Sequence, residues 1–420
     1  MMKRTSRVLA AGAAAALLFG LTACGGGGGF GETGNGGGDN ADTSSPAAGD
    51  GSITVLIGSS GDAETNFVQS AVDEWSQESG NTGSLQLASD LPQQLAQGFA
   101  AGSPPDVFYV STDAFAGWAE NGSLWAYGDQ LGDFDYHQSL VDTFTYDGTF
   151  YCAPKDFSTL ALVINTDLWE KAGLTDADLP TDWDSLKATA EKLTADGVVG
   201  LSFGPEWQRV GTFMAQAGGG LMNDAGQAIV DDPANVTALT YVKELLASGF
   251  AAYPADIGAG WGGEAIGAGK AAMVIEGNWV IGALANDFPD VNYKIAALPE
   301  GPGGPGTLQF TNCWGIAADS PNQEAALDFV KFMSSDEQQM ANARALGVMP
   351  AVTTVKDQWS SEFPAQAPFI DGADNAQGFP ALAGVQAVIT EFNNQLVGLK
   401  DADLNQMLGT LQGDLEAIVP

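Results

Sequence analysis

The chain has 420 residues, of which 45% are hydrophobic, so it is long enough for two or three domain-sized units with packed cores. It carries 15 Lys and Arg against 52 Asp and Glu, which gives a formal net charge of -37. This acidity argues against binding to nucleic acid or to an anionic membrane surface, because both partners require a basic surface.

The first residues are typical of a secretion signal. A basic start at residues 3–7 precedes an apolar stretch at 8–21, which is shorter than the roughly 20 residues that a spanning helix needs. The sequence LTAC (21–24) resembles the bacterial lipobox, where the chain is cut before the cysteine and the cysteine receives lipid. We therefore expect a signal peptide at 1–23 and lipidation at Cys24. An ordinary cleaved signal with an incidental cysteine is the alternative.

Residues 24–50 are rich in Gly, Asn, Asp and Ser. Such a composition cannot bury a core, and it predicts a flexible tether. We accordingly expect an exported protein that is anchored to the outer face of the cell membrane by Cys24.

After the tether, strand-like and helix-like segments alternate. The run SITVLIG (52–58) predicts a buried strand, and apolar residues at helical spacing over 66–80 predict a helix that ends at Gly80. Further strands are predicted at PPDVFYV (104–110), TLALVIN (159–165), KAAMVIEG (270–277) and YKIAALP (293–299). The alternation favours α/β layers with mostly parallel sheets.

Two helix starts and one break between elements can also be located in this pattern. Thr181 is predicted to cap the helix that follows it, and Ser320 to cap another, with Pro321 in its first turn. The segment LPEGPGGPGTLQF (298–310) is too rich in Pro and Gly to continue an element. We interpret it as a crossing or a loop between two lobes that more than one chain passage joins.

Two cysteines remain after Cys24, namely Cys152 and Cys313. Disulfides persist in the oxidising compartments that exported chains enter, which favours a pair, although two separate buried thiols are the alternative. With His137 as the single histidine, we expect no structural zinc site, because such sites use four Cys or His ligands.

Motifs for catalysis or cofactor binding are weak. Residues 258–263 and 301–306 fit G-x-G-x-x-G, but neither follows a strand and opens a helix as a dinucleotide site requires. His137 is predicted to be a solvated loop residue, which leaves little material for a Ser-His-Asp triad. The 52 acids do not single out a glycoside hydrolase pair. We therefore expect no cofactor and no catalytic residue.

The segment PPDVFYVSTDAFAGWAENGSLWAY (104–127) resembles a strand and helix of the extracellular sugar-binding proteins of ABC importers, the family 1 class that includes maltose-binding protein. Similar segments follow in the family's order, and the resemblance covers nearly everything from Ile53 onward. They are TLALVINTDLWEKAG (159–173) with LPTDWDSLKATAEKL (179–193), IGAGKAAMVIEGNWVIGAL (266–284), CWGIAADSPNQEAALDFVKFMSSDEQQ (313–339) and LGVMPA (346–351).

The resemblance implies a periplasmic-binding-protein-like fold, with two lobes and a hinge of multiple crossings that close on a ligand. Lobe 1 is expected at 51–154 and 301–350, and lobe 2 at 155–300 and 351–420. The implied function is that of a monomeric, non-catalytic lipoprotein that captures a sugar or oligosaccharide and delivers it to an ABC permease. The alternatives are a binder of another solute, such as a metal, a polyamine or a phosphate compound, and a secreted glycoside hydrolase.

Several residues are candidates for ligand contact. Asp113 lies where the family's sugar-binding Asp is found, although Ala114 replaces the Arg that often follows it, and a first-turn helix acid is the alternative. Trp279 matches the family's stacking Trp, with core packing as the alternative. Ser60 and Glu64 follow the first strand, so we expect them at a sheet edge and a helix entrance.

The remaining candidates are matched more loosely. Glu206 and Trp207 fall where the family places an acid and an aromatic residue on the second lobe. Asp156 lies at the expected first crossing, where it serves either the hinge or the ligand. Trp261 belongs to an exposed-looking Gly-rich segment, and Phe379 lies near where relatives supply another aromatic residue.

Overall fold

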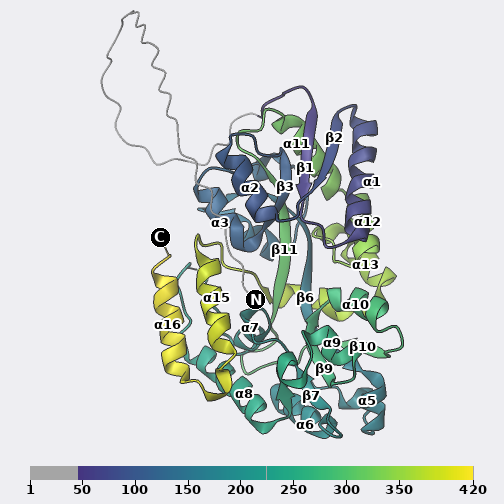
Figure 1. Cartoon of the computed structure of the whole chain (residues 1–420), viewed down its shortest axis with the longest axis vertical. Helices are drawn as coiled ribbons and strands as arrows, with labels where there is room; N and C mark the ends of the chain where they lie inside the picture. Colours follow the sequence, from purple (N-terminus) through teal and green to yellow (C-terminus); the bar gives the residue numbers. More distant parts are fainter. Residues whose placement is uncertain (1–45, 224, 420) are drawn as a thin grey trace, which may run out of the picture. The chain divides into compact units, whose positions relative to one another are not determined.

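The computed structural model describes residues 46–223 and 225–419, in which strands and helices alternate as the sequence predicts (Figure 1). The expected signal peptide at 1–23 and the expected lipidation at Cys24 lie outside the described residues. Within the part of the chain that the structure describes, every helix is too short or too polar to cross a bilayer.

The main sheet has the strand order β2-β1-β3-β11-β6-β9-β7-β8, with β10 paired to β6 and β12 paired to β11. Its strands are β1 (Ser52–Ile57), β2 (Thr82–Leu87), β3 (Val107–Ser111), β6 (Ala153–Asn165), β7 (Val199–Ser202), β8 (Ala251–Ala252), β9 (Ala271–Gly277), β10 (Tyr293–Ala296), β11 (Thr307–Ile316) and β12 (Ala376–Gln377). A separate hairpin joins β4 (Thr145–Tyr146) to β5 (Thr149–Phe150). Each strand that the sequence predicts is present.

Helices cover the sheet along its whole length. They are α1 (Asp62–Ser79), α2 (Leu91–Ala100), α3 (Thr112–Glu120), α4 (Gln138–Thr143), α5 (Thr166–Lys171), α6 (Trp183–Leu193), α7 (Trp207–Gln216), α8 (Pro233–Ser248), α9 (Gly262–Gly267), α10 (Trp279–Asp287), α11 (Gln323–Ser334), α12 (Asp336–Leu346), α13 (Lys356–Glu362), α14 (Ala367–Asp371), α15 (Val385–Leu396) and α16 (Leu404–Glu416).

Both predicted helix caps are wrong by one or two residues. The cap of α6 is Asp182, whose side chain accepts a hydrogen bond from the Ser185 backbone N–H. The cap position of α11 is Asn322, while the Ser320 hydroxyl donates to the Asp106 carboxylate at 2.6 Å. In both places the caps compete with other polar partners within a few residues, so spacing alone does not locate the first turn.

The buried apolar side chains form two main cores. The first core is built from residues 53–161 and 313–373, and the second core from residues 160–308 and 385–415. A smaller cluster packs α9 and α10 against β7 and β9 beside the second core. Helices α1, α2 and α3 lie around the first core, and α5 to α9 lie around the second (Figure 1).

Two long antiparallel strands, β6 and β11, belong to both cores. All thirteen residues of β6 are buried, with Phe157 in the first core and Leu160 in the second. Strand β11 begins with Leu308 in the second core and ends with Ile316 in the first. A third passage runs through 374–384. Of the Pro- and Gly-rich segment at 298–310, residues 298–306 lie on the second core, and residues 307–310 are the start of β11, the strand that crosses.

The chain immediately before β1 contacts the start of α11. The Ala47 backbone N–H donates to Gln323 Oε1 at 3.1 Å, and the Asp50 N–H donates to Asn322 Oδ1 at 3.0 Å. The tether that we expected to reach residue 50 therefore contacts the folded part from Ala47 onward.

Candidate functional site

The carboxyl ends of the parallel strands of both cores point toward the region between them. Strand β3 is antiparallel to β11 and ends with Ser111 beside Asn312, at the middle of the crossing strand. Strand β9 is antiparallel to β6 and ends with Gly277 beside Leu160, where β6 enters the second core. Strand β1 is parallel to β3, and β7 is parallel to β9. Polar residues after these strands are thus brought toward one region, as expected for a ligand site in an open α/β sheet.

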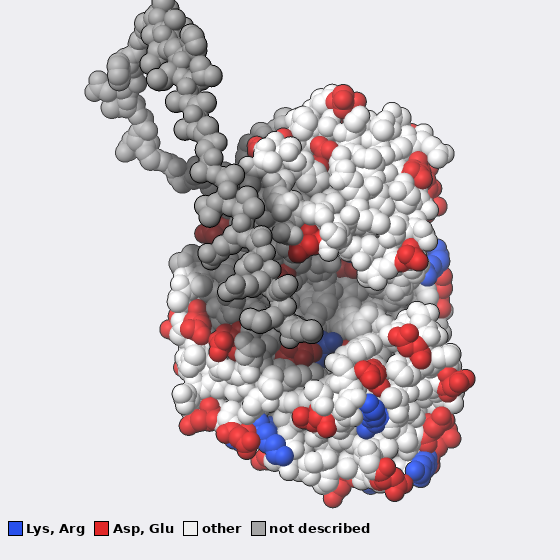
Figure 2. All heavy atoms as spheres, in the orientation of Figure 1, with Lys and Arg blue, Asp and Glu red and all other residues white. Residues whose placement is uncertain are grey.

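The visible face of the molecule is hollowed between its upper and lower parts (Figure 2). On this face acidic side chains are scattered widely and basic ones are few, in agreement with the net charge of -37. A recess between two packed units is a common setting for small-molecule sites.

A cluster of five residues lies at the carboxyl ends of the second-core strands, and we call it the Trp279 cluster: Glu206, Arg209, Glu276, Trp279 and Phe310. Glu276 is buried in β9, and its Oε2 accepts hydrogen bonds from Arg209 Nη2 at 2.8 Å and from Trp279 Nε1 at 3.1 Å. Glu206 Oε1 lies 3.5 Å from Arg209 Nη1. The cluster therefore contains two carboxylates and one guanidinium, and it has a net negative charge.

The ring of Trp279 is the exposed aromatic surface of this cluster. Trp279 begins α10 and is 37% exposed, whereas every other tryptophan is buried or half-buried. The Phe310 ring meets it edge-on, with centroids 5.2 Å apart. A half-exposed indole beside carboxylates offers an apolar face and hydrogen-bond acceptors together, which is the chemistry that a sugar ring requires.

Glu206 differs from Glu276 in its exposure to solvent. Burial raises the pKa of Glu206 and the Glu276 charge adds to the increase, while Arg209 opposes it. One third of the Glu206 side chain is nevertheless exposed. A carboxylate that is partly desolvated and weakly paired gains from an added hydrogen-bond donor, such as a ligand hydroxyl.

Asp113 approaches the same region from the first core. It occupies the first turn of α3, two residues after Ser111, and it has no hydrogen bond or ion pair with another described residue. Asn312, which pairs with Ser111, is two residues from Phe310 on β11, so α3 begins on the first-core side of the crossing strands, close in register to the residue that contacts Trp279.

Three other candidates gather around Lys155, on the first-core side of the crossing strands. Lys155 Nζ contacts Glu64 Oε1 at 3.1 Å and Asp156 Oδ2 at 2.6 Å. The second Glu64 oxygen accepts hydrogen bonds from the backbone N–H and the hydroxyl of Ser60. Tyr109 also donates to Glu64 Oε1, at 3.0 Å. We refer to these five residues as the Lys155 network.

Apart from the exposed Ser60, the residues of the Lys155 network are buried, and their charged groups are paired with one another. Burial opposes the charge on Lys155, but attraction to Asp156, Tyr109 and Glu64 raises its pKa above the ordinary value. Burial alone would raise the pKa of Glu64, but Lys155 and the hydrogen bonds from Ser60 outweigh burial and lower it. Since the carboxylates are already occupied, this arrangement favours a structural role at the first crossing over direct ligand contact.

The lowered pKa of Glu64 predicts that its contribution to the stability of the fold depends on pH. A carboxyl whose folded pKa is depressed stabilises the fold above its unfolded pKa of about 4.3, and the effect is lost as the pH falls through the folded value. In urea titrations, we expect Glu64→Gln to be less stable than the parent by about 1–3 kcal/mol at pH 7, with a smaller difference at pH 3. Glu170→Gln, on the exposed side of α5, is the control. A difference that does not change with pH would contradict this assignment.

The other aromatic candidates are divided between the core and the site. Trp207 is buried and its ring meets Phe379 edge-on at 5.5 Å, so these two residues pack together at the second core. Trp261 is half-buried at the cap of α9, directly before Gly262. A β-carbon on Gly262 would lie 2.4 Å from Glu276 Oε1, so the backbone beside Trp261 adjoins the Trp279 cluster.

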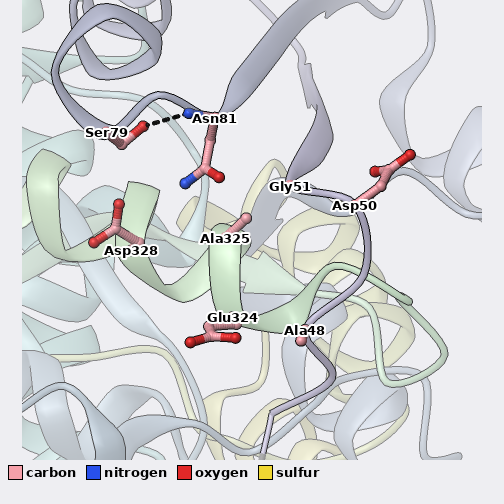
Figure 3. A pocket seen from close by; sticks show the side chains of 8 residues that line it. All are labelled: Ala48, Asp50, Gly51, Ser79, Asn81, Glu324, Ala325 and Asp328. Carbon is pink, nitrogen blue, oxygen red and sulfur yellow. Dashed lines mark hydrogen bonds between the residues drawn. The ribbon is translucent and has the colours of Figure 1, made fainter.

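Three other hollows of the described residues lie elsewhere. One of about 550 Å³ is lined by Asp50, Asn81, Glu324 and Asp328, beside the docked segment before β1 (Figure 3). Two more, of about 550 and 520 Å³, lie on the second core. None of these three contains an expected ligand residue. We place the candidate site at Trp279 because exposed aromatic and acidic groups converge there, whereas the pocket before β1 is lined by acidic, polar and small residues without an aromatic ring.

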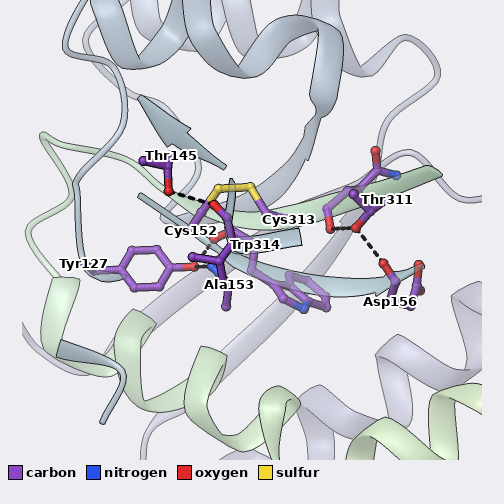
Figure 4. Close-up of a disulfide and its surroundings, with 10 residues drawn as sticks. Tyr127, Thr145, Cys152, Ala153, Asp156, Thr311, Cys313 and Trp314 are labelled. Carbon is purple, nitrogen blue, oxygen red and sulfur yellow. Dashed lines mark hydrogen bonds between the residues drawn. A yellow bond between two sulfur atoms is a disulfide. The ribbon is translucent and has the colours of Figure 1, made fainter. Parts of the chain in front are cut away.

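The structure joins Cys152 and Cys313 in a disulfide, with Cα atoms 5.7 Å apart (Figure 4). The bond links the residue before β6 to the middle of β11, on the first-core side of the crossing. On the same two strands, the Thr311 hydroxyl donates to the Asp156 carbonyl at 2.6 Å. The crossing strands are therefore held covalently where they enter the first core.

Removing this disulfide is expected to lower the free energy of unfolding by about 2–4 kcal/mol, because its 161-residue separation closes a large loop in the unfolded chain. The variant Cys152→Ala/Cys313→Ala tests this in urea titrations without reductant. Adding reductant to the parent should move its transition toward that of the variant. A variant as stable as the oxidised parent would contradict the prediction.

The prediction for His137 is wrong, because its ring is buried against Phe157 rather than solvated. Burial lowers the pKa of His137, and the nearby Lys356 acts in the same direction. Within the described residues, no group of three or more His, Cys, Asp and Glu side chains could hold a metal ion.

Sequence reasoning did not identify Arg209, Glu276 or Phe310 as parts of the site. Glu276 lies inside a strand and Phe310 in a segment interpreted as a break, so neither stood out. The spacing of Glu206 and Arg209, three residues apart at a helix start, was the signal that could have indicated an ion pair.

Comparisons with known proteins agree with this geometry. Residues 59–340 match the family described as bacterial extracellular solute-binding protein. The diacetylchitobiose binding protein DasA of Streptomyces coelicolor is 25% identical over 315 residues, which cover 72% of this chain and 74% of that protein.

Two solved structures share the fold. The cyclic alpha-maltosyl-1,6-maltose binding protein from Arthrobacter globiformis has a TM-score of 0.77 at 21% identity, covering 88% of this chain and 98% of the other. The ABC substrate-binding protein Lmo0181 from Listeria monocytogenes, solved in complex with cycloalternan, has a TM-score of 0.74 at 23% identity, covering 87% and 98%.

Proposed function

Because the chain belongs to the bacterial extracellular solute-binding protein family, we propose that it captures a sugar or oligosaccharide between its two lobes for an ABC importer. The observation that carries this proposal is the half-exposed Trp279 ring, whose N–H donates to Glu276, in one cluster with Arg209 and its partner Glu206 at the strand ends that face the region between the cores. The ring would stack on the apolar face of a sugar, and the partly exposed Glu206 carboxylate would accept hydrogen bonds from its hydroxyls.

The relatives support a carbohydrate ligand. One is named for diacetylchitobiose, another for a cyclic maltosyl-maltose, and a third was solved with cycloalternan. We therefore propose the class of ligand and leave its identity to the experiment below.

The charge of the site supports a neutral ligand over an anionic one. Arg209 is the cation of the Trp279 cluster, and it is engaged by both Glu206 and Glu276. A phosphate compound would therefore face a net negative site. This is the physical reason for preferring a sugar to the alternative of a phosphate-containing solute.

The two lobes of the proposal follow the two cores. We assign residues 46–159 and 311–373 to the first lobe, and residues 160–310 and 385–419 to the second, with 374–384 as the third passage. This differs from the boundary expected at 351, because Trp359 and Phe369 are buried in the first core. Ligand contacts from both lobes would favour a closed state over an open one, which is what closure requires.

The location of the protein at the membrane and its permease partner are part of the same proposal. The lipidated Cys24 would anchor a monomeric chain to the outer face of the cell membrane, and a permease would receive the ligand unaltered. The alternative of a secreted glycoside hydrolase predicts turnover of a sugar by the purified chain, whereas the proposed receptor binds without turnover.

A thermal-shift screen tests this function. A ligand that binds the native state raises the melting temperature according to its concentration and affinity. We expect a neutral oligosaccharide to raise it, and glycerol phosphate and spermidine to leave it unchanged. A shift produced by one of the charged solutes, with none from any saccharide, would contradict the proposal.

A further inference from the structure

Arg209 has no assigned part in the ligand contacts proposed above, yet it touches every member of the Trp279 cluster. We propose that Arg209 is a positioning residue that fixes the Trp279 ring in the orientation that receives a sugar. This inference rests on the proposed carbohydrate site, which it deepens by naming the residue that prepares the aromatic surface.

The first link between Arg209 and the ring is a shared acceptor. A single oxygen, Glu276 Oε2, accepts from Arg209 Nη2 at 2.8 Å and from the indole Nε1 at 3.1 Å. The Glu276 side chain is only 2% exposed and projects from a buried strand, so its position is fixed. Through this oxygen, the guanidinium holds the acceptor to which the indole N–H is bound.

The second link is direct contact with the ring. Arg209 Cζ lies 5.2 Å from the Trp279 ring centroid, within the range of a cation–π interaction, and 5.8 Å from the Phe310 centroid. The Phe310 ring is nearly perpendicular to the indole, at 87°. Arg209 therefore lies beside both rings and maintains the angle between them.

The third observation concerns the backbone that adjoins the ring. A β-carbon on Gly277 would lie 2.2 Å from the indole, so the ring rests directly on the strand end. With Gly277, Phe310 and Arg209 around it, the ring is confined, yet its side chain remains 37% exposed. A ring that is already fixed loses less conformational entropy when a sugar stacks on it.

The rival explanation is that Arg209 only neutralises two acids. In that case its loss would destabilise the fold or alter the charge of the site, and the effect on affinity would not depend on Trp279. The two explanations make different predictions for a double-mutant cycle, because only residues that act through each other give non-additive effects.

The experiment is a cycle of Arg209→Met, Trp279→Ala and the double variant, in the full chain. Each is titrated by calorimetry with the saccharide that gives the largest thermal shift. We expect each single change to weaken binding about tenfold or more, and the double variant to bind no more weakly than Trp279→Ala alone. A double variant whose loss of affinity equals the product of the two single losses would overturn the inference.

A second cycle uses Arg209→Lys, which keeps the charge but loses the planar fork that pairs with Glu276 and covers the ring. It keeps the test decisive if Arg209→Met fails to fold. We expect Arg209→Lys to weaken binding in the parent, and to have no further effect on affinity when Trp279 is already alanine. Parental affinity in Arg209→Lys would show that charge alone matters, and it would overturn the inference.

The matched control is Arg344→Met, which removes another arginine from a pair with Glu362, on the surface of the first core. It should leave the affinity unchanged. If the parent binds no saccharide, the proposed function fails and this inference with it. If the parent binds and Trp279→Ala weakens binding, but the cycle is additive, only the role of Arg209 is refuted.

Discussion

Replacing Trp279 with alanine is expected to weaken saccharide binding by roughly tenfold to a hundredfold, while the chain stays folded. A well-packed aromatic contact at a binding site is worth about 2 kcal/mol or more, and each 1.4 kcal/mol is tenfold in affinity. The ring is half-exposed at the start of α10, so its removal opens no cavity in either core. Titration calorimetry measures the affinity, and circular dichroism monitors the fold.

Trp279→Phe is the matched variant for this prediction. It keeps an aromatic face but loses the N–H that donates to Glu276. We expect an affinity between those of the parent and Trp279→Ala. Parental affinity in Trp279→Ala, with the melting temperature unchanged, would remove Trp279 from the site and with it the main support for a stacked sugar.

Replacing Lys155 with methionine is expected to destabilise the fold by about 3–5 kcal/mol, the usual cost of removing one partner from a buried ion pair. Lys155 is buried between Glu64 and Asp156, so the change strands two carboxylates away from water. Urea titration at pH 7 measures the loss. Because protonation relieves a stranded carboxylate, the loss should become smaller toward pH 3.

Lys171→Met is the matched control for the Lys155 variant. Lys171 pairs with Asp196 on the surface, where the side chains are 66% and 75% exposed. Exposed pairs contribute at most about 1 kcal/mol, so this control should be close to the parent in stability. Equal stabilities of the two variants would contradict the structural role given to the Lys155 network.

The strands and helices could be predicted where the apolar residues of a segment form a run or recur at a regular spacing. The run at 52–57 and the apolar spacing before Gly80 became β1 and α1 as expected. Strand β6 begins at Ala153, six residues earlier than predicted, because APKDFS lacks an apolar run. Its burial comes from packing between two cores, which a local pattern does not contain.

The candidate site was predictable in part for the same reason. Trp279 and Glu206 both follow the ends of strands in one sheet. The pairing of those strands brings such positions together even when they are distant in sequence. The pairing of Glu64 with Lys155, 91 residues apart, depends on how β1 and β6 are arranged and has no local signal. The Trp207–Phe379 contact likewise depends on the third passage between the cores.

The most direct test of this account is a calorimetric titration of the purified chain with neutral oligosaccharides, followed by mass analysis of the recovered ligand. The account predicts saturable binding of one saccharide per chain, with the ligand recovered intact. Failure of every saccharide to bind, or recovery of a cleaved product, would contradict it.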